Sequence, residues 1–389
     1  DGQIGEEGET DDVIYILSLS TVLKEVNSSA PRVREAIVDE IGQLGCNGNP
    51  ENCTTEDLAD QLKIRQSLVE DLDVLPKVTR KDIPERRNFP SFSGRECGEY
   101  FLASASASTN SICYHQVINP VPLLGMEKLR LLPILSNMMP ELGSAGRSYI
   151  ETQRLQHRVC GGISAFVSFR GTPADCNIPV GYLTVSSKTL QRYATDMIRV
   201  VKETVNEIRF DEKERFKELL NQIYVRKLNG ITSNGHQLAM MAASSSLRPS
   251  ARISELGSGI SGLLNLKQML KKVSRDNELK AVLEELSDLY LSVNSAKPHL
   301  LAIAGGADLK TVENDLVSIW SKQSSSSNMS VENLTDYTSE NIAYIISAKV
   351  NFCAAAYPTV SENHPDSAAL SVLGSVLRNG FLHSEIREK

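Results

Sequence analysis

The ten residues Cys160-Gly161-Gly162-Ile163-Ser164-Ala165-Phe166-Val167-Ser168-Phe169 contain the pattern that decides the fold class of this chain. After the two glycines, apolar residues alternate with small or polar ones, which is the period of a β-strand with one buried face. The paired glycines indicate close packing of the backbone before the strand. Gly181–Val185 is predicted to be the next strand along the chain.

Working outward, the same pattern predicts strands at Glu99–Ala105, Ser111–Ile118, Pro298–Ala304 and 342–356. Helical periodicity is found between these strands. The predicted helices are Met126–Leu142, one that begins at Ser187 or Lys188, one that runs from an Asp211 cap to Gly230, and 234–246, 259–272, 275–287, 308–321 and Asp366–Asn379. Strands and helices do not alternate strictly, so we predict an α+β fold with a largely antiparallel sheet packed by helices.

The N-terminal segment has a different character. Apolar positions over 12–75 keep to one face and are interrupted at Pro31 and Pro76, which predicts an antiparallel helical hairpin followed by an extended linker. A serine run at 324–327 marks a second boundary. We therefore divide the chain into a hairpin and linker (1–88), a large α+β domain (89–328) and the beginning of another domain (329–389).

Composition excludes several classes of protein. The chain has 41 Lys+Arg and 48 Asp+Glu, and residues 1–60 hold 14 acidic residues against 3 basic ones. Without an aromatic and basic patch, this balance argues against nucleic acid as a partner. No apolar run approaches the ~18–20 residues that span a bilayer, so we expect no membrane partner. Seven widely spaced cysteines are typical of reduced thiols inside a cell.

A complete active site is not visible in the sequence. It contains no HxxEH, HExxH, GxSxG, Walker A or GxGxxG motif. None of the six histidines has a partner at i,i+4, so the sequence predicts no metal site in this chain. Gly305-Gly306 follows an apolar strand but lacks the Lys and Ser/Thr of a phosphate loop, which favours a tight turn from strand to helix.

One cluster near the end of the chain has chemical potential. His383 and Arg387 are spaced i,i+4 just after Gly380. An arginine presents a rigid fork of charged donors that suits a carbonyl, a carboxylate or a developing oxyanion. The alternative is a surface arginine that pairs with Glu385 or Glu388, and the residues alone leave both interpretations open.

Six segments resemble, in order and spacing, the C-terminal half of the presequence protease and falcilysin branch of the pitrilysin/insulinase-type (inverzincin) zinc metallopeptidases. The resemblance covers most of residues 55–389. The segments are Leu75–Pro84, Thr109–Tyr114, Leu131–Leu142 with Tyr149–Glu151, Cys160–Ser164, Ile253–Leu263 and Leu373–Lys389.

The resemblance implies pitrilysin-like domains, the third at 89–328 and a truncated fourth at 329–389. It also implies a metalloendopeptidase that degrades unstructured peptides, such as cleaved targeting peptides, in a closed chamber. Zinc would be bound by the N-terminal catalytic half, which is the partner of this chain, and Arg387 would orient the substrate carbonyl. The expected location is an organelle, the mitochondrial matrix or a plastid.

Three further expectations complete the interpretation. The chain begins at Asp1 and ends at Lys389 within predicted structure, so we expect it to be part of a longer protein and inactive alone. Peptides are expected to bind in extended form, by adding a strand to a sheet edge. The alternatives are a catalytically inactive relative that serves as a structural or peptide-binding subunit, and an unrelated α+β binding module.

Overall fold

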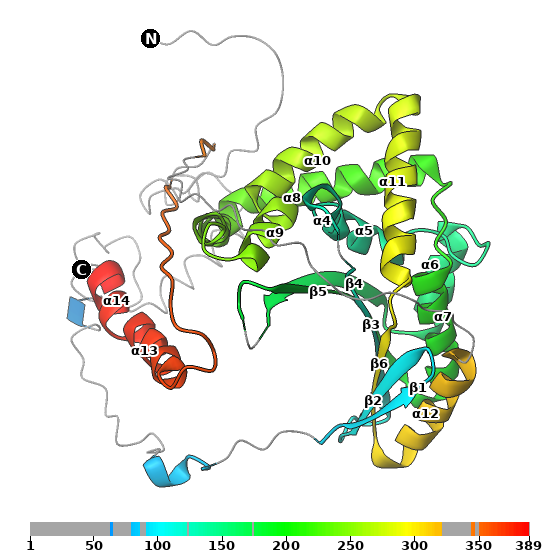
Figure 1. Cartoon of the computed structure of the whole chain (residues 1–389), viewed down its shortest axis with the longest axis horizontal. Helices are drawn as coiled ribbons and strands as arrows, with labels where there is room; N and C mark the ends of the chain where they lie inside the picture. The colour runs from blue at the N-terminus through cyan, green and yellow to red at the C-terminus, as the bar shows by residue number, and fades with distance from the viewer. Residues whose placement is uncertain are drawn as a thin grey trace, which may run out of the picture. The chain divides into compact units, whose positions relative to one another are not determined.

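The structure is a computed structural model that describes residues 63–64, 79–85, 91–122, 124–172, 175–320, 344–346 and 350–388. The chain divides into two units, Asp1–Asn88 and Phe89–Lys389 (Figure 1). The first unit contains the 3₁₀ turn η3 (Arg80–Asp82), closed by a capping box between Thr79 and Asp82. The predicted hairpin at 12–75 lies outside the described residues, apart from a helical pair at 63–64, as does the predicted boundary at 328.

The second unit is built on one six-stranded sheet of order β1-β2-β6-β3-β5-β4. All neighbouring strands are antiparallel except β2 and β6, which are parallel. The strands are β1 (Ser93–Cys97), β2 (Tyr100–Ser106), β3 (Ile112–Pro120), β4 (Ile163–Gly171), β5 (Pro179–Leu190) and β6 (His299–Ala304). The predicted α+β class with a largely antiparallel sheet is confirmed.

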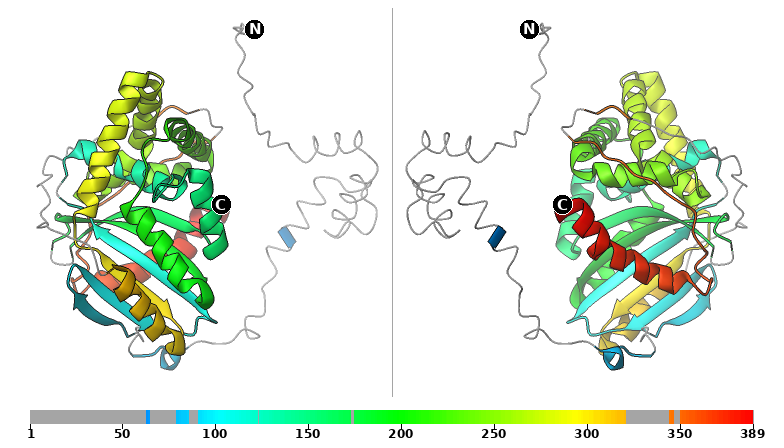
Figure 2. Two further views of the ribbon diagram at one scale, coloured as in Figure 1. Left: turned by 90° about the vertical axis from the view of Figure 1, so that its right-hand side faces the viewer. Right: turned by 90° about the vertical axis from the view of Figure 1, so that its left-hand side faces the viewer.

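Helices pack on one face of this sheet, as Figures 1 and 2 show for α5, α7, α9 and α12. The helices are α4 (Met126–Leu129), α5 (Leu132–Met138), α6 (Tyr149–Val159), α7 (Ala194–Asn206), α8 (Lys213–Ser244), α9 (Pro249–Ser258), α10 (Ile260–Val273), α11 (Asp276–Asn294), α12 (Gly306–Trp320), α13 (Ser367–Asn379) and α14 (Phe381–His383). Short turns of helix are η4 (Met139–Glu141), η5 (Gln191–Tyr193) and the π-helical η6 (Ser384–Glu388).

The core lies between the sheet and these helices. Helix α7 buries Met197, Ile198, Val200, Val201 and Val205. At roughly 2 kcal/mol for each fully buried aliphatic side chain, these five contribute about 10 kcal/mol before the entropy of ordering is subtracted. The facing strand side chains, which include Leu102, Val117, Val185 and Leu300, are all at most 2% exposed. Trp320, the only tryptophan of the chain, is fully buried at the end of α12.

Two predicted helices differ from the structure at their N-termini. The helix expected from Ser187 or Lys188 begins only at Ala194, because β5 continues to Leu190 in register with Ile112 of β3. The Asp211 cap is also wrong, since Arg209 holds the Asp211 carboxylate and α8 begins after Glu212. The Glu212 carboxylate instead accepts from the backbone N–H groups of Gly143 (2.8 Å) and Tyr149 (2.9 Å).

Three further differences concern the interior of predicted elements. The apolar segment Met126–Leu142 is divided into α4, α5 and η4, with Pro133 and Pro140 at the starts of the last two. Helix α8 continues past the predicted end at Gly230, despite the roughly 1 kcal/mol cost of a helical glycine, and is interrupted four residues later at Asn234, where the next predicted helix (234–246) begins. In the predicted strand at 342–356, residues 344–346 and 350–356 form no strand, and the remainder lies outside the described residues.

His115 on β3 is a buried histidine that has one protein partner. Its Nδ1–H donates to the carbonyl oxygen of Leu301 at 3.1 Å, and its Nε2 has no partner among the described residues. Burial lowers the pKa of His115 to about 4. Because the unfolded chain binds this proton near pH 6.5, the unfolded state holds more protons between pH 6.5 and 4. Stability should therefore fall as the pH falls through this window.

We predict that unfolding free energy drops by roughly 2 kcal/mol from this residue alone between pH 7 and pH 5. Urea unfolding followed by the fluorescence of Trp320 measures it. The variant His115→Leu should lose this part of the pH dependence, whereas His157→Leu, at an exposed position of α6, should keep it. Identical pH dependence in His115→Leu and the unmodified chain would contradict the prediction.

Candidate functional site

The face of the sheet that points away from α5, α7, α9 and α12 is exposed and mainly apolar. Strand register places side chains of β2 to β6 on this face in alternation with the buried ones. Tyr114 is 38%, Phe166 47% and Leu190 44% exposed. The apolar members of this open face are Phe101, Ile112, Tyr114, Ile118, Phe166, Tyr182, Leu190, Leu301 and Ile303. Three of these nine side chains are exposed and six are half-buried, and an apolar surface of this kind is a candidate binding site.

Polar groups are interspersed on the open face, and few of them are charged. Gln116 donates from Nε2 to the hydroxyl of Ser186 at 3.4 Å, across two neighbouring strands. His299 lies beside Phe101, with ring centroids 5.5 Å apart, and burial lowers the pKa of this histidine. Lys188 and Arg170 supply positive charge towards the β4–β5 end. The surface can therefore contact side chains of varied chemistry without requiring one particular charge.

The hydrogen-bond pattern identifies which groups of β4 point away from the sheet. The N–H of Val121 donates to the oxygen of Gly181, so odd-numbered residues of β5 bond to β3. Even-numbered residues of β5 then bond to β4, because the backbone groups of a strand alternate between its two sides. The bond from Thr172 N–H to the oxygen of Ile178 agrees.

The register pairs even-numbered residues of β5 with even-numbered residues of β4, such as Thr184 with Phe166. Odd-numbered residues of β4 therefore direct both their N–H and C=O groups to the outer edge. No described strand pairs with that edge. The residues with these outward groups are Ile163, Ala165, Val167 and Phe169.

The two edge strands of the sheet differ in how well they are protected against pairing with another chain. β1 is only five residues long, and its charged residues Arg95 and Glu96 pair with Glu313 and Lys297. Short strands with charged side chains are how proteins prevent pairing at an edge. β4 is nine residues long and Arg170 is its only charged residue. It therefore offers a template on which another extended chain can pair.

The start of β4 is fixed by bonds to β5. Gly162 has a φ of +99°, which only glycine adopts without strain, and no atom lies within 4 Å of the position that a Cβ would take there. Ser187 Oγ donates to the oxygen of Gly162 at 2.9 Å, and Gly161 N–H donates to the oxygen of Lys188 at 2.9 Å. A Cβ at Gly161 would lie 3.5 Å from the Lys188 oxygen, an ordinary contact, so close packing requires neither glycine, and Gly162 is required for its conformation.

The structure offers little metal or nucleophile chemistry. Among the described residues, no group of three or more His, Cys, Asp or Glu side chains is placed to hold a metal ion. Burial raises the pKa of the Cys113 thiol to about 11, so this cysteine stays protonated at neutral pH. Gly305-Gly306 forms the turn from β6 to α12, as predicted. Within the part of the chain that the structure describes, no helix has the length and apolarity to cross a membrane.

The predicted site residue Arg387 lies in η6, directly after α14. The structure describes its backbone and not its side chain, so its role stays a prediction. The preceding helix α13 ends at Gly380, as predicted, and is amphipathic with an exposed apolar side that includes Leu373 and Val376. The sequence did not identify the outward groups of β4, although the near absence of charge in Ile163–Phe169 was a visible signal.

Comparisons with known proteins give a consistent result. The family described as Peptidase M16 (subfamily C) associated matches residues 53–269. The chain is 24% identical over 360 residues to "Presequence protease, mitochondrial" of Xenopus tropicalis, covering 83% of this chain and 34% of that protein. It is 27% identical over 279 residues to "Presequence protease 1, chloroplastic/mitochondrial" of Arabidopsis thaliana, covering 68% and 25%.

A third relative, "Presequence protease, mitochondrial" of Emericella nidulans, is 24% identical over 379 residues, covering 94% of this chain and 36% of that protein. The chain thus spans about a third or less of the length of these curated relatives. Among solved structures, a conserved protein from Enterococcus faecalis superposes with a TM-score of 0.41 and 10% identity, covering 58% of this chain and 52% of that one.

The assignment of outward groups leads to a prediction about proline substitutions in β4. Ser164→Pro removes an N–H that bonds to β5, whereas Ala165→Pro removes one that faces the free edge. Ser164→Pro should therefore destabilise the chain by roughly 1 kcal/mol more than Ala165→Pro. Urea unfolding measures both, and equal or reversed losses would show that the assignment is wrong.

Proposed function

The chain belongs to the Peptidase M16 (subfamily C) associated family, and on this basis we propose that it is the non-zinc-binding half of a metallo-oligopeptidase that degrades unstructured peptides. The observation that carries this proposal is the combination of an apolar open face with the unprotected edge of β4. The sequence resemblance to the presequence protease branch is confirmed by relatives that are named presequence proteases. In this proposal the half forms one wall of a chamber in which peptides are held.

Strand addition is the mode of binding that the surface supports. An extended peptide beside β4 would bond to the outward N–H and C=O groups of Ala165 and Val167. Alternate side chains of the peptide would then lie on the open face, next to Phe166. Backbone bonds are independent of sequence, and the apolar surface accepts many side chains, so peptides of varied sequence could bind. A folded protein offers no free extended segment for this pairing.

In this proposal, zinc is bound by a different part of the protein. A catalytic zinc needs three protein ligands with an open fourth position, and the described residues do not offer such a set. The ligands and the general base would lie in the N-terminal catalytic half, which is the proposed partner. Arg387 would approach from η6 and orient the scissile carbonyl through its guanidinium. Because the named relatives are mitochondrial or chloroplastic, we place the protein in the mitochondrial matrix or a plastid.

Native and denaturing mass measurement of the purified protein, with zinc analysis, is the direct test. A zinc-containing assembly in which this chain is joined or bound to a second half, and which cleaves unstructured peptides, is the expected result. A metal-free protein whose complete gene lacks HxxEH would replace the proposal with the catalytically inactive subunit.

Peptide binding to this chain alone can be measured by hydrogen exchange. Adding an unstructured peptide should slow exchange of the outward amides of Ala165 and Val167 more than that of Phe166, which is already bonded to β5. The same peptide with alternate N-methylated amides is the control, because it cannot complete the ladder. Protection that is uniform along β4, or unchanged by N-methylation, would argue against strand addition.

Arg387→Ala in the zinc-containing protein should lower kcat about 100-fold with little change in KM, because one preorganised donor to the reacting oxygen is lost. Arg378→Ala, at an exposed position in the last turn of α13, is the matched control and should be close to unmodified activity. Zinc content must stay equal in both variants. Unchanged kcat in Arg387→Ala would return this residue to the surface interpretation.

A further inference from the structure

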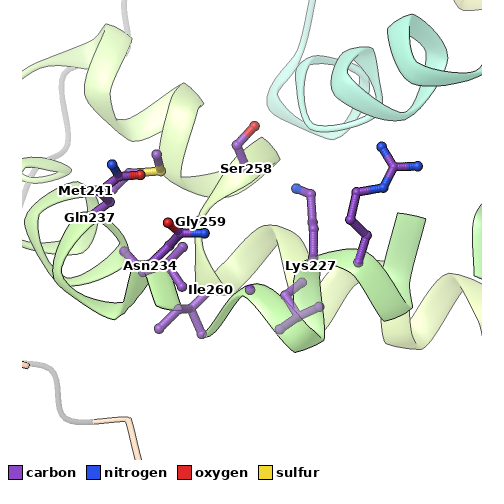
Figure 3. A pocket seen from close by; sticks show the side chains of 11 residues that line it. Lys227, Asn234, Gln237, Met241, Ser258, Gly259 and Ile260 are labelled. Atoms are coloured by element: carbon purple, nitrogen blue, oxygen red, sulfur yellow. The ribbon is translucent and has the colours of Figure 1, made fainter. Parts of the chain in front are cut away.

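A small cavity lies in the helical layer, between α8 and the junction of α9 with α10 (Figure 3). Its volume is about 270 Å³, slightly below the range of pockets for drug-sized ligands. None of its lining residues belongs to the sheet, so the cavity is separate from the open face and from the function proposed for it. It requires its own explanation.

Two local breaks in helical structure frame the cavity. Helix α8 bends at Asn234, whose backbone (φ −116°, ψ 17°) is not helical. On the other side, α9 ends at Ser258 and α10 begins after Gly259. Figure 3 shows the lining residues Asn234 and Gln237 of α8 together with Ser258, Gly259 and Ile260 from the junction of α9 with α10.

The charged side chains that line the cavity are both positive. Arg226 and Lys227 line it, and no acidic residue does. Lys227 is partly buried and its Nζ donates to the carbonyl oxygen of Gly257 at 3.2 Å. Burial lowers the pKa of Lys227. Among the described residues, no carboxylate forms an ion pair with either cation.

Several other partly buried cations among the described residues have acidic partners, although Lys202, like Lys227, donates to a backbone carbonyl oxygen. Arg147 pairs with Glu203, and Arg215 pairs with both Glu141 and Glu218. Withdrawing a cation from water without such a partner costs free energy, so a buried cation is normally paired. Lys227 has only a neutral carbonyl as its partner, which leaves its charge available to an anion.

The nearby acid Glu255 is already engaged. It is 2% exposed, and its Oε1 accepts from the N–H of Ser261 at 3.0 Å in the first turn of α10. This bond satisfies a donor at the start of α10, so the helix terminus is not the anion-binding feature. The binding chemistry comes from Lys227 and Arg226.

The remainder of the cavity wall is apolar or neutral. Leu238 and Met241 from α8 face the cavity together with Ile260 and Leu263 from α10. The amides of Asn234 and Gln237 add neutral hydrogen-bonding groups. A ligand that fits this wall has an anionic end and a short apolar body.

We propose that this cavity binds a carboxylate attached to a short apolar body, with Lys227 and Arg226 holding the carboxylate. Two sources supply this chemistry: the C-terminal residue of a peptide and a short-chain fatty acid. Both place a carboxylate within a few bonds of an aliphatic group, and they differ in the amide that a peptide end also carries.

The test uses the whole chain labelled with ¹³C at the methyl groups of its eight methionines. The Met241 methyl lines the cavity and its signal is assigned by Met241→Leu. N-acetyl-leucine and hexanoate are added as the two carboxylate probes, and N-acetyl-leucinamide is the uncharged control. The Met241 signal should shift in a saturable manner with a carboxylate probe and not with the amide.

Three variants separate binding from loss of structure. Lys227→Met should weaken binding about tenfold or more, as expected when a charged hydrogen-bond donor is removed. Arg226→Gln, at an exposed position, should weaken it several-fold while the chain stays folded. Lys271→Met, at an exposed position of α10 outside the cavity, should bind as the unmodified chain does.

The outcomes are distinct. A shift with N-acetyl-leucine and none with hexanoate assigns the site to peptide ends, and the reverse assigns it to fatty acids. The proposal is overturned if neither carboxylate shifts Met241 at millimolar concentration, if the amide binds as tightly, or if both Lys227→Met and Arg226→Gln retain full affinity. None of these measurements depends on peptidase activity, so a negative binding result does not contradict the function proposed for the sheet.

Discussion

The sheet is continuous because β6 lies between β2 and β3. It pairs in parallel with β2, Phe101 opposite His299, and antiparallel with β3, Gln116 opposite Leu301. Leu300, Ala302 and Ala304 are fully buried under the helices as a result. Without β6, strands β1 and β2 would have no backbone hydrogen bonds to strands β3, β5 and β4. The open face is one continuous surface only because β6 pairs with both β2 and β3, which brings together residues near 100, 115 and 300.

Much of the fold follows from local pattern. Alternation over Gly161–Phe169 and Ser111–Ile118 located β4 and β3 correctly, because a half-buried strand leaves a period of two in its sequence. Other features of the fold could not be predicted from local pattern, because they depend on contacts with other segments of the chain. The residues Ser187–Leu190 extend β5 because β3 is beside them, and Asp211 fails as a cap because Arg209 holds it. Gly230 stays helical, and α8 is interrupted only at Asn234.

The candidate site was less accessible to sequence analysis. Which backbone groups of β4 point outward depends on the register with β5 and β3, which is a property of the sheet and not of Ile163–Phe169 alone. The cavity beside Lys227 joins residues of α8 to Gly259, and although the sequence predicted a break between Gly230 and residue 234, it could not show that α9 and α10 lie beside that break. Arg387 could be selected only through family resemblance, since an arginine in the charged segment that ends at Lys389 has no distinguishing local pattern.

The central position of β6 has a consequence for synthesis of the chain on the ribosome. Once Leu190 has emerged, β3, β4 and β5 can pair, and β1 can pair with β2, but the inner edges of β2 and β3 have no partner. About 100 residues must still be added before His299–Ala304 can enter between them. At roughly 5–20 residues per second, these edges are exposed for about 5–20 s. A nascent chain in this state offers two open strands to its neighbours, so shielding by a chaperone matters most in that interval.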